Sequence, residues 1–75
     1  MTPKQPGPLQ NQIRRLRFEH DEMTQKELAD RVGVTRQTIS AIENGEYNPS
    51  ALLALRLARA LDKPFQDLFY LEEKS

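Results

Sequence analysis

The sequence predicts an all-α fold, a single domain of five short helices. Apolar residues recur three and four positions apart in five separate segments, which is the spacing of a helix face turned toward a core. Residues that favour helix starts precede these segments, and turn residues separate them. No alternating strand pattern extends beyond a few residues. With 75 residues, the chain is long enough for one small core and no more.

Composition excludes several classes of protein. Without cysteine there is no disulfide framework and no cysteine-based metal site. No segment approaches the roughly 20 apolar residues of a membrane span, and "MTPKQPGPLQ" lacks the apolar centre of a signal peptide. We therefore expect a cytoplasmic protein without membrane contact. Eleven basic residues balance eleven acidic ones, so nucleic-acid binding would require folding to gather positive charge on one face.

The chain divides into three parts. Residues 1–10 contain three prolines and one glycine, and we expect them to form a flexible N-terminal arm. The folded domain is expected to span residues 11–71, and residues 72–75 to form a C-terminal tail.

The first two helices are predicted from their ends. Asn11 can cap a helix that runs to about His20. Thr24, with Glu27 three residues later, fits a capping box that starts a helix ending near Val32. The residues expected to face the core here are Ile13, Leu16, Leu28, Ala29 and Val32.

The third helix follows the tight turn "GVT". Gly33 can end the preceding helix in the left-handed conformation, and Thr35 can cap a helix from Arg36 to about Glu43. Its expected core residues are Val34, Ile39 and Ile42.

Two more helices complete the core. Ser50 can cap a helix that runs to about Leu61, and Pro64 lies at the start of a last short helix in "FQDLFYL". The residues expected to face the core are Ala51, Ala54, Leu55, Ala58, Leu61, Phe65, Leu68 and Phe69.

This register leaves Leu52 and Leu53 on the outer side of the fourth helix. They are candidate contacts of a homodimer, together with Tyr70 and Leu71 beyond the last core helix. The alternative is chance exposure, because single leucines on a protein surface are common.

Two short helices joined by a tight turn form a helix-turn-helix arrangement. The second helix of the pair keeps one polar side, which carries Arg36, Gln37, Ser40 and Ala41. In DNA-binding versions the first residues of this helix reach base edges in the major groove. Arginine suits guanine and glutamine suits adenine, each by paired hydrogen bonds. The alternative is an ordinary solvated helix face.

The order and spacing of "IRRLR", "TQKELADRVGVTRQTISAIENG", "NPS" and "LARAL…DLF" resemble the Cro/phage-repressor-like helix-turn-helix regulators, the Xre family. The resemblance extends from about Asn11 to Phe69. It implies a compact five-helix lambda-repressor-like domain with a central helix-turn-helix. It also implies a transcriptional regulator that binds double-stranded DNA as a homodimer on a palindromic operator.

The resemblance implies roles for single residues. Arg36, Gln37, Ser40 and Ala41 match the base-facing positions, and readout should depend mainly on Arg36 and Gln37 because the other two are small.

Contacts with backbone phosphates are implied for Gln25, Thr35, Thr38 and Asn44. Arg14 is either a further phosphate contact or plain surface. Arg17 and Glu43 match a partly buried ion pair that joins the first helix to the recognition helix.

Enzymatic chemistry has no support in the sequence. There is no nucleophile-base constellation, no metal-ligand spacing and no phosphate-binding glycine loop, and a lone His20 among carboxylates is not a metal site. We expect no enzyme, no cofactor and no metal. Two alternatives remain for the function. One is an antitoxin-like or co-regulator module whose partner is a toxin or polymerase, and the other is a restriction-modification controller.

Overall fold

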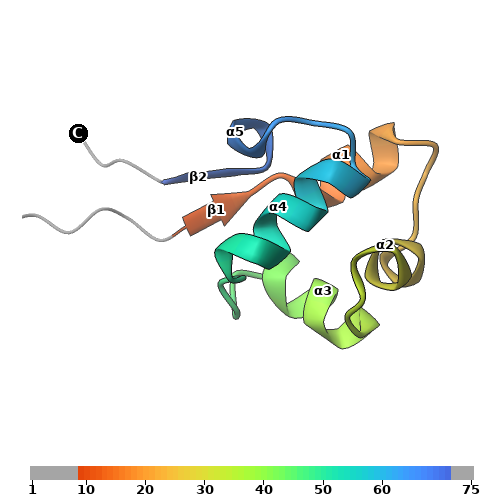
Figure 1. Cartoon of the computed structure of the whole chain (residues 1–75), viewed down its shortest axis with the longest axis horizontal. Helices are drawn as coiled ribbons and strands as arrows, with labels where there is room; N and C mark the ends of the chain where they lie inside the picture. The colour runs from red at the N-terminus through yellow and green to blue at the C-terminus, as the bar shows by residue number, and fades with distance from the viewer. Residues whose placement is uncertain (1–8, 72–75) are drawn as a thin grey trace, which may run out of the picture.

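The computed structural model describes residues 9–71, and most of the expected arm and the whole tail at 72–75 lie outside the described residues. The described part contains five helices and two short strands, in agreement with the predicted all-α class apart from the strands (Figure 1). In chain order they are β1 (Leu9–Asn11), α1 (Ile13–Glu19), α2 (Gln25–Val32), α3 (Arg36–Glu43), α4 (Ala51–Ala60), α5 (Phe65–Leu68) and β2 (Phe69–Leu71).

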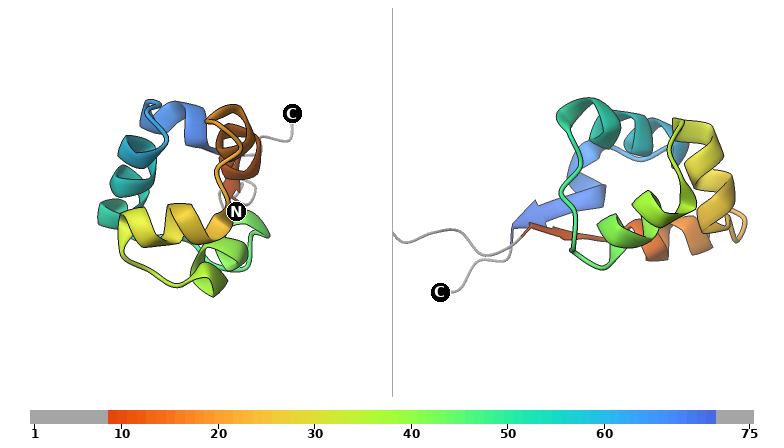
Figure 2. Two further views of the ribbon diagram at one scale, coloured as in Figure 1. Left: turned by 90° about the vertical axis from the view of Figure 1, so that its right-hand side faces the viewer. Right: turned by 90° about the horizontal axis from the view of Figure 1, so that it is seen from below.

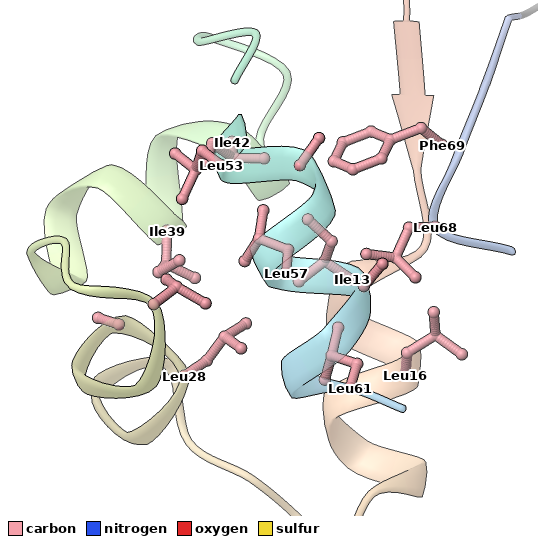
Figure 3. Close-up of a cluster of buried hydrophobic side chains, with 14 of the residues drawn as sticks. Ile13, Leu16, Leu28, Ile39, Ile42, Leu53, Leu57, Leu61, Leu68 and Phe69 are labelled. Atoms are coloured by element: carbon pink, nitrogen blue, oxygen red, sulfur yellow. The ribbon is translucent and has the colours of Figure 1, made fainter. Parts of the chain in front are cut away.

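The helices surround one core to which all five contribute (Figures 2 and 3). Its fully buried large side chains are Ile13, Leu28, Ile39, Ile42, Leu57, Leu61 and Leu68. Each such side chain stabilises the fold by about 1.5–3 kcal/mol relative to an exposed one. Within residues 9–71 no polar or charged residue is buried, so the core is held together by apolar packing.

The two strands form a small antiparallel sheet at the end of the molecule away from α2 (Figures 1 and 2). Leu9 pairs with Leu71 and Asn11 with Phe69. The expectation of a flexible arm through residue 10 is therefore wrong for Leu9 and Gln10. Three-residue strands carry too short an alternation to be recognised in a sequence, and Leu9 is held because it packs against the core.

The predicted inward face of α4 is rotated from the observed one. Leu53 is only 9% exposed and Leu57 is fully buried, whereas Leu55 is 59% exposed. Ala51, expected in the core, is also exposed. The helix "ALLALRLARA" is rich in apolar residues on several sides, so periodicity alone does not determine which leucines turn inward. Leu53 is thus a core residue and not a candidate dimer contact.

Two further expectations differ from the structure. Phe65 is 42% exposed, with its ring centroid 5.5 Å from that of the buried Phe69, so it borders the core instead of filling it. Helix α1 begins one residue later than a cap at Asn11 would require, with Gln12 at the N-cap position and no side-chain cap bond from it. The Asn11 side chain still accepts a hydrogen bond from the backbone N–H of Ile13, the first residue of the helix, as the predicted cap would. None of the helices within the described residues has the length and apolar character needed to cross a membrane.

Candidate nucleic-acid interface

Helix α2 begins with the predicted capping box. The hydroxyl oxygen of Thr24 accepts a hydrogen bond from the backbone N–H of Glu27 at 3.0 Å, and the backbone N–H of Thr24 donates to the Glu27 carboxylate at 3.4 Å. These two contacts satisfy amides that a helix start leaves without partners. The first residue of α2, Gln25, is thereby placed at a defined helix end.

The turn between α2 and α3 depends on Gly33. Its φ of 79° lies in the left-handed region, which glycine adopts without a steric penalty. The backbone N–H of Val34 returns to the carbonyl of Ala29 at 3.0 Å, which closes the helix end in a Schellman-type arrangement. Val34 packs against the core and so fixes where α3 starts.

Helix α3 begins at a threonine cap. The hydroxyl oxygen of Thr35 accepts from the backbone N–H of Thr38 at 3.2 Å, and the two threonine hydroxyls are 3.0 Å apart. Both hydroxyls thus lie at the start of the helix, on the outside of the domain. No acidic residue occupies the first turn of α3, so this end keeps the partial positive charge of its free amides.

The outer face of α3 carries the predicted base-reading residues. Arg36 and Gln37 are exposed, while Ser40 and Ala41 are half-buried. Within residues 9–71 no carboxylate forms an ion pair with Arg36. On the opposite face, Ile39 and Ile42 are fully buried. The helix is therefore fastened on one side and has polar groups free on the other.

A charged contact holds the last turn of α3 against α1. Arg17 Nε lies 2.6 Å and Nη2 lies 3.1 Å from the two carboxylate oxygens of Glu43. The side chains are 12% and 6% exposed. Arg17 Nη1 also donates to the carbonyl of Met23 at 2.8 Å. This two-pronged geometry is the strong form of an arginine–carboxylate contact, and it connects α1, the following loop and α3.

Gln25 adds a third donor to the same carboxylate. Its Nε2 donates to Glu43 Oε1 at 3.1 Å, which links the first residue of α2 to the last residue of α3. The family resemblance implied a phosphate contact for Gln25 but did not identify Glu43 as its partner. No local spacing signals this contact, because the two residues lie 18 positions apart.

The end of α3 is closed by Gly45 and Asn11. Gly45, at φ 77°, donates to the carbonyl of Ile42 at 3.1 Å, and the N–H of Glu46 donates to the carbonyl of Ala41 at 2.9 Å. The side chain of Asn11 also donates to the Ile42 carbonyl, at 2.8 Å. Sequence reasoning missed this contact, which has no local signature. Asn44 is exposed at this end of the helix.

The other predicted positions lie on different surfaces. Arg14 is exposed on α1. Leu52 on α4 and the β2 residues Tyr70 and Leu71 are about half exposed or more. Near them, a groove of about 290 Å³ is lined by Leu9, Pro49, Ala51, Ala54, Leu55, Phe65 and Phe69. No cluster of three potential metal ligands occurs in the described part of the chain.

Comparison with known proteins finds helix-turn-helix proteins. The helix-turn-helix family model matches residues 13–68. An HTH-type transcriptional regulator of Methanothermobacter thermautotrophicus is 60% identical over 52 residues, which cover 68% of this chain and 75% of that protein. The regulator YgzD of Bacillus subtilis is 43% identical over 67 residues, which cover 89% of this chain and 100% of that protein.

One solved structure is also similar. It is the restriction-modification controller protein C.AhdI from Aeromonas hydrophila, which superposes with a TM-score of 0.68 at 33% sequence identity. The match covers 73% of this chain and 82% of that one.

Proposed function

Because the chain belongs to the Cro/C1-type helix-turn-helix family of transcriptional regulators, which bind DNA and are not enzymes, we propose that it acts as a homodimer on an approximately palindromic operator. The two copies of α3 would enter successive major grooves about one helical turn apart. The observation that carries this proposal is the fastened α3, whose apolar side is buried and whose Arg36 and Gln37 project freely from the other side.

Base reading is assigned to the first turns of α3. Arg36 can donate two hydrogen bonds to guanine, and Gln37 can pair with adenine through its amide. Ser40 and Ala41 are half-buried and short, so they allow close approach to the groove and contribute less to specificity.

Contacts with backbone phosphates would set the register of α3 on DNA. Thr35 and Thr38 present hydroxyls at the positive end of α3, and Asn44 is exposed at its other end. Gln25 uses one amide hydrogen on Glu43 and has a second available, since a side-chain amide carries two. Arg14 on α1 would add a contact outside the motif.

Dimerisation is assigned to the surface formed by Leu52, Leu55, Phe65, Tyr70 and Leu71. All five side chains are at least 42% exposed, and two of them, Leu55 and Phe65, line the apolar groove beside Phe69. Leu55 and Phe65 replace Leu53 in this assignment.

Leu55→Glu should convert a dimer to a monomer in sedimentation, because a buried unpaired charge is costly. Gln37→Glu adds the same charge on α3 and should leave the mass of the assembly unchanged. A Leu55→Glu protein that remains a dimer would exclude this surface as the dimer interface.

The test of base reading is a selection from random-sequence duplexes with purified protein at stated salt. A palindromic consensus is expected, and Gln37→Ala and Arg36→Ala should each weaken it at one position per half-site. The matched control for the lost charge is Arg59→Ala, on the exposed side of α4, which should keep the consensus intact. Each lost base contact should reduce discrimination by about 1–3 kcal/mol. A consensus unaltered by both α3 variants would contradict the assignment.

A second candidate is a controller of a restriction-modification system, favoured by the similarity to C.AhdI. A controller would read DNA with α3 in the same way, and it would differ from the general regulator only in the operator that it binds. If methyltransferase and endonuclease genes adjoin this gene, the selected consensus should recur in their promoter. Absence of the consensus from that promoter would exclude the controller and leave the general regulator.

A further inference from the structure

One asparagine side chain joins β1, the start of α1 and the end of α3. Asn11 Nδ2 donates to the carbonyl oxygen of Ile42 at 2.8 Å, and Asn11 Oδ1 accepts from the backbone N–H of Ile13 at 3.2 Å. A carbonyl can only accept and a backbone N–H can only donate, so the two partners determine which end of the amide is which. Asn11 and Ile42 lie 31 positions apart, and the contact is therefore purely tertiary.

The carbonyl of Ile42 lies in the last turn of α3, where carbonyls have no partner within the helix. Gly45 N–H donates to the same oxygen at 3.1 Å. The next residue, Glu43, is held through its carboxylate by Arg17. Helix α3 is thus attached near its end at two points. Arg17 binds the side chain of Glu43, and Asn11 binds the main-chain carbonyl of Ile42.

The backbone of Asn11 is itself fixed. Asn11 is the Cα partner of Phe69 in the sheet, and the adjacent Gln12 N–H donates to the carbonyl of Leu68 at 2.9 Å. Leu68 and Phe69 are buried. The amide of Asn11 therefore extends from a part of the chain that cannot shift without disturbing the core.

We propose that Asn11 is a positioning residue that sets the orientation of α3 and so determines how well the protein distinguishes its operator from other DNA. The proposal rests on the proposed function, in which α3 reads DNA. Asn11 acts through the carbonyl of Ile42 and makes no contact with a base.

The variant Asn11→Asp separates the two hydrogen bonds of the side chain. An aspartate keeps an acceptor for the Ile13 N–H, and its negative charge at the start of α1 is favourable. It has no donor for the Ile42 carbonyl at neutral pH. Asn11→Ala loses both contacts. The control Ser50→Ala removes a helix cap elsewhere, where the Leu53 N–H donates to the Ser50 hydroxyl at 3.1 Å.

The DNA arm of the test measures dissociation constants for two duplexes of equal length. One is the duplex recovered by the selection described above, and the other is its scrambled sequence, both at one fixed salt concentration. Asn11→Asp and Asn11→Ala should weaken binding to the selected duplex by about 3–10-fold, because one hydrogen bond changes an equilibrium by up to about tenfold. Binding to the scrambled duplex should change less than about twofold, since phosphate contacts dominate it.

Ser50→Ala should lower the melting temperature by roughly 4–8 °C yet keep the wild-type ratio of the two dissociation constants. A wild-type ratio in Asn11→Asp would overturn the proposal. So would an equal loss of ratio in Ser50→Ala, which would show that lowered stability alone produces the effect.

A second arm uses the free protein and needs no DNA. Amide hydrogen exchange at Gly45 and Glu46 reports on the end of α3, because these amides donate to the carbonyls of Ile42 and Ala41. Asn11→Asp should speed exchange at both amides by about 3–10-fold. The amide of Val34, in the turn before α3, donates to the carbonyl of Ala29 in α2 and should be unchanged. Unchanged exchange at Gly45 and Glu46 would refute the positioning role. Faster exchange in a protein that selects no DNA would instead refute the proposed function and leave the attachment of α3 standing.

Discussion

Replacing Glu43 by glutamine removes one charge from the contact that fastens α3. The oxygen of the new side-chain amide can still accept from Arg17 Nη2 and Gln25 Nε2, which both lie 3.1 Å from Glu43 Oε1. Its NH₂ group then faces the Arg17 Nε–H, which now lies 2.6 Å from Glu43 Oε2. Arg17 would keep its hydrogen bond to the carbonyl of Met23. The variant therefore leaves a largely buried guanidinium with only part of its hydrogen bonding and no counter-charge.

The expected loss follows from burial. An exposed ion pair contributes about 0.2–1 kcal/mol, whereas removing one partner of a buried pair costs about 3–5 kcal/mol. The two side chains are 12% and 6% exposed and thus largely buried. The hydrogen bonds that remain to the amide oxygen and to the carbonyl of Met23 offset part of the loss. We expect Glu43→Gln to lower the free energy of unfolding by about 2–3 kcal/mol. For a domain of this size that is a large share of a total of about 4–10 kcal/mol.

The assay is urea denaturation at fixed protein concentration, followed by circular dichroism, with thermal melting as a second probe. The melting temperature should fall by roughly 10–20 °C. The control Glu46→Gln makes the same chemical change at an exposed residue and should stay within about 0.5 kcal/mol of wild type. In a double-mutant cycle, Arg17→Met should cost at least about 1 kcal/mol less when position 43 already carries glutamine. A Glu43→Gln protein as stable as the Glu46→Gln control would refute the reasoning.

Four other substitutions test the backbone and the core. Asp62→Gly should stabilise by about 0.5 kcal/mol in urea denaturation, because Asp62 has a φ of 54° and glycine removes the left-handed strain at some cost in entropy; a loss of stability would contradict this. Gly33→Ala should destabilise by about 1 kcal/mol through conformation alone, since no atom lies within 4 Å of the added Cβ, and an unchanged denaturation midpoint would be the contrary result. Leu57→Ala should cost about 2–5 kcal/mol in urea denaturation. Leu55→Ala, on the exposed side of α4, should stay within about 0.5 kcal/mol of wild type when both are measured at protein concentrations low enough for the wild type to be monomeric; the reverse order under those conditions would show that α4 is rotated.

The helix-turn-helix could be predicted because its signals are local. Thr24 and Thr35 cap their helices through residues three positions away, and Gly33 ends α2 by its own backbone conformation. These interactions depend on a few neighbouring residues, so the sequence pattern contains them. The buried positions of α2 and α3 followed from the same short segments.

The remaining features depend on contacts that no short segment contains. The inward side of α4 is decided by what surrounds it, because leucines lie on more than one side of that helix. The pairing of β1 with β2 and the bond from Asn11 to Ile42 join residues far apart in the chain. The contact between Gln25 and Glu43 likewise depends on how α2 packs against α3, which no short segment of the sequence specifies.

The strand pair makes the described chain almost a closed ring, because Leu9 and Leu71 face each other across the sheet. A short peptide could connect the two strands, and new ends could be opened in the exposed loop at Glu46 and Tyr47. Such a circular permutant would retain every helix while exchanging the order in which they leave the ribosome. It would also place a fusion partner beside the end of α3. In the natural chain order, a partner fused next to either strand would lie at the strand end of the molecule, away from α2 (Figure 1).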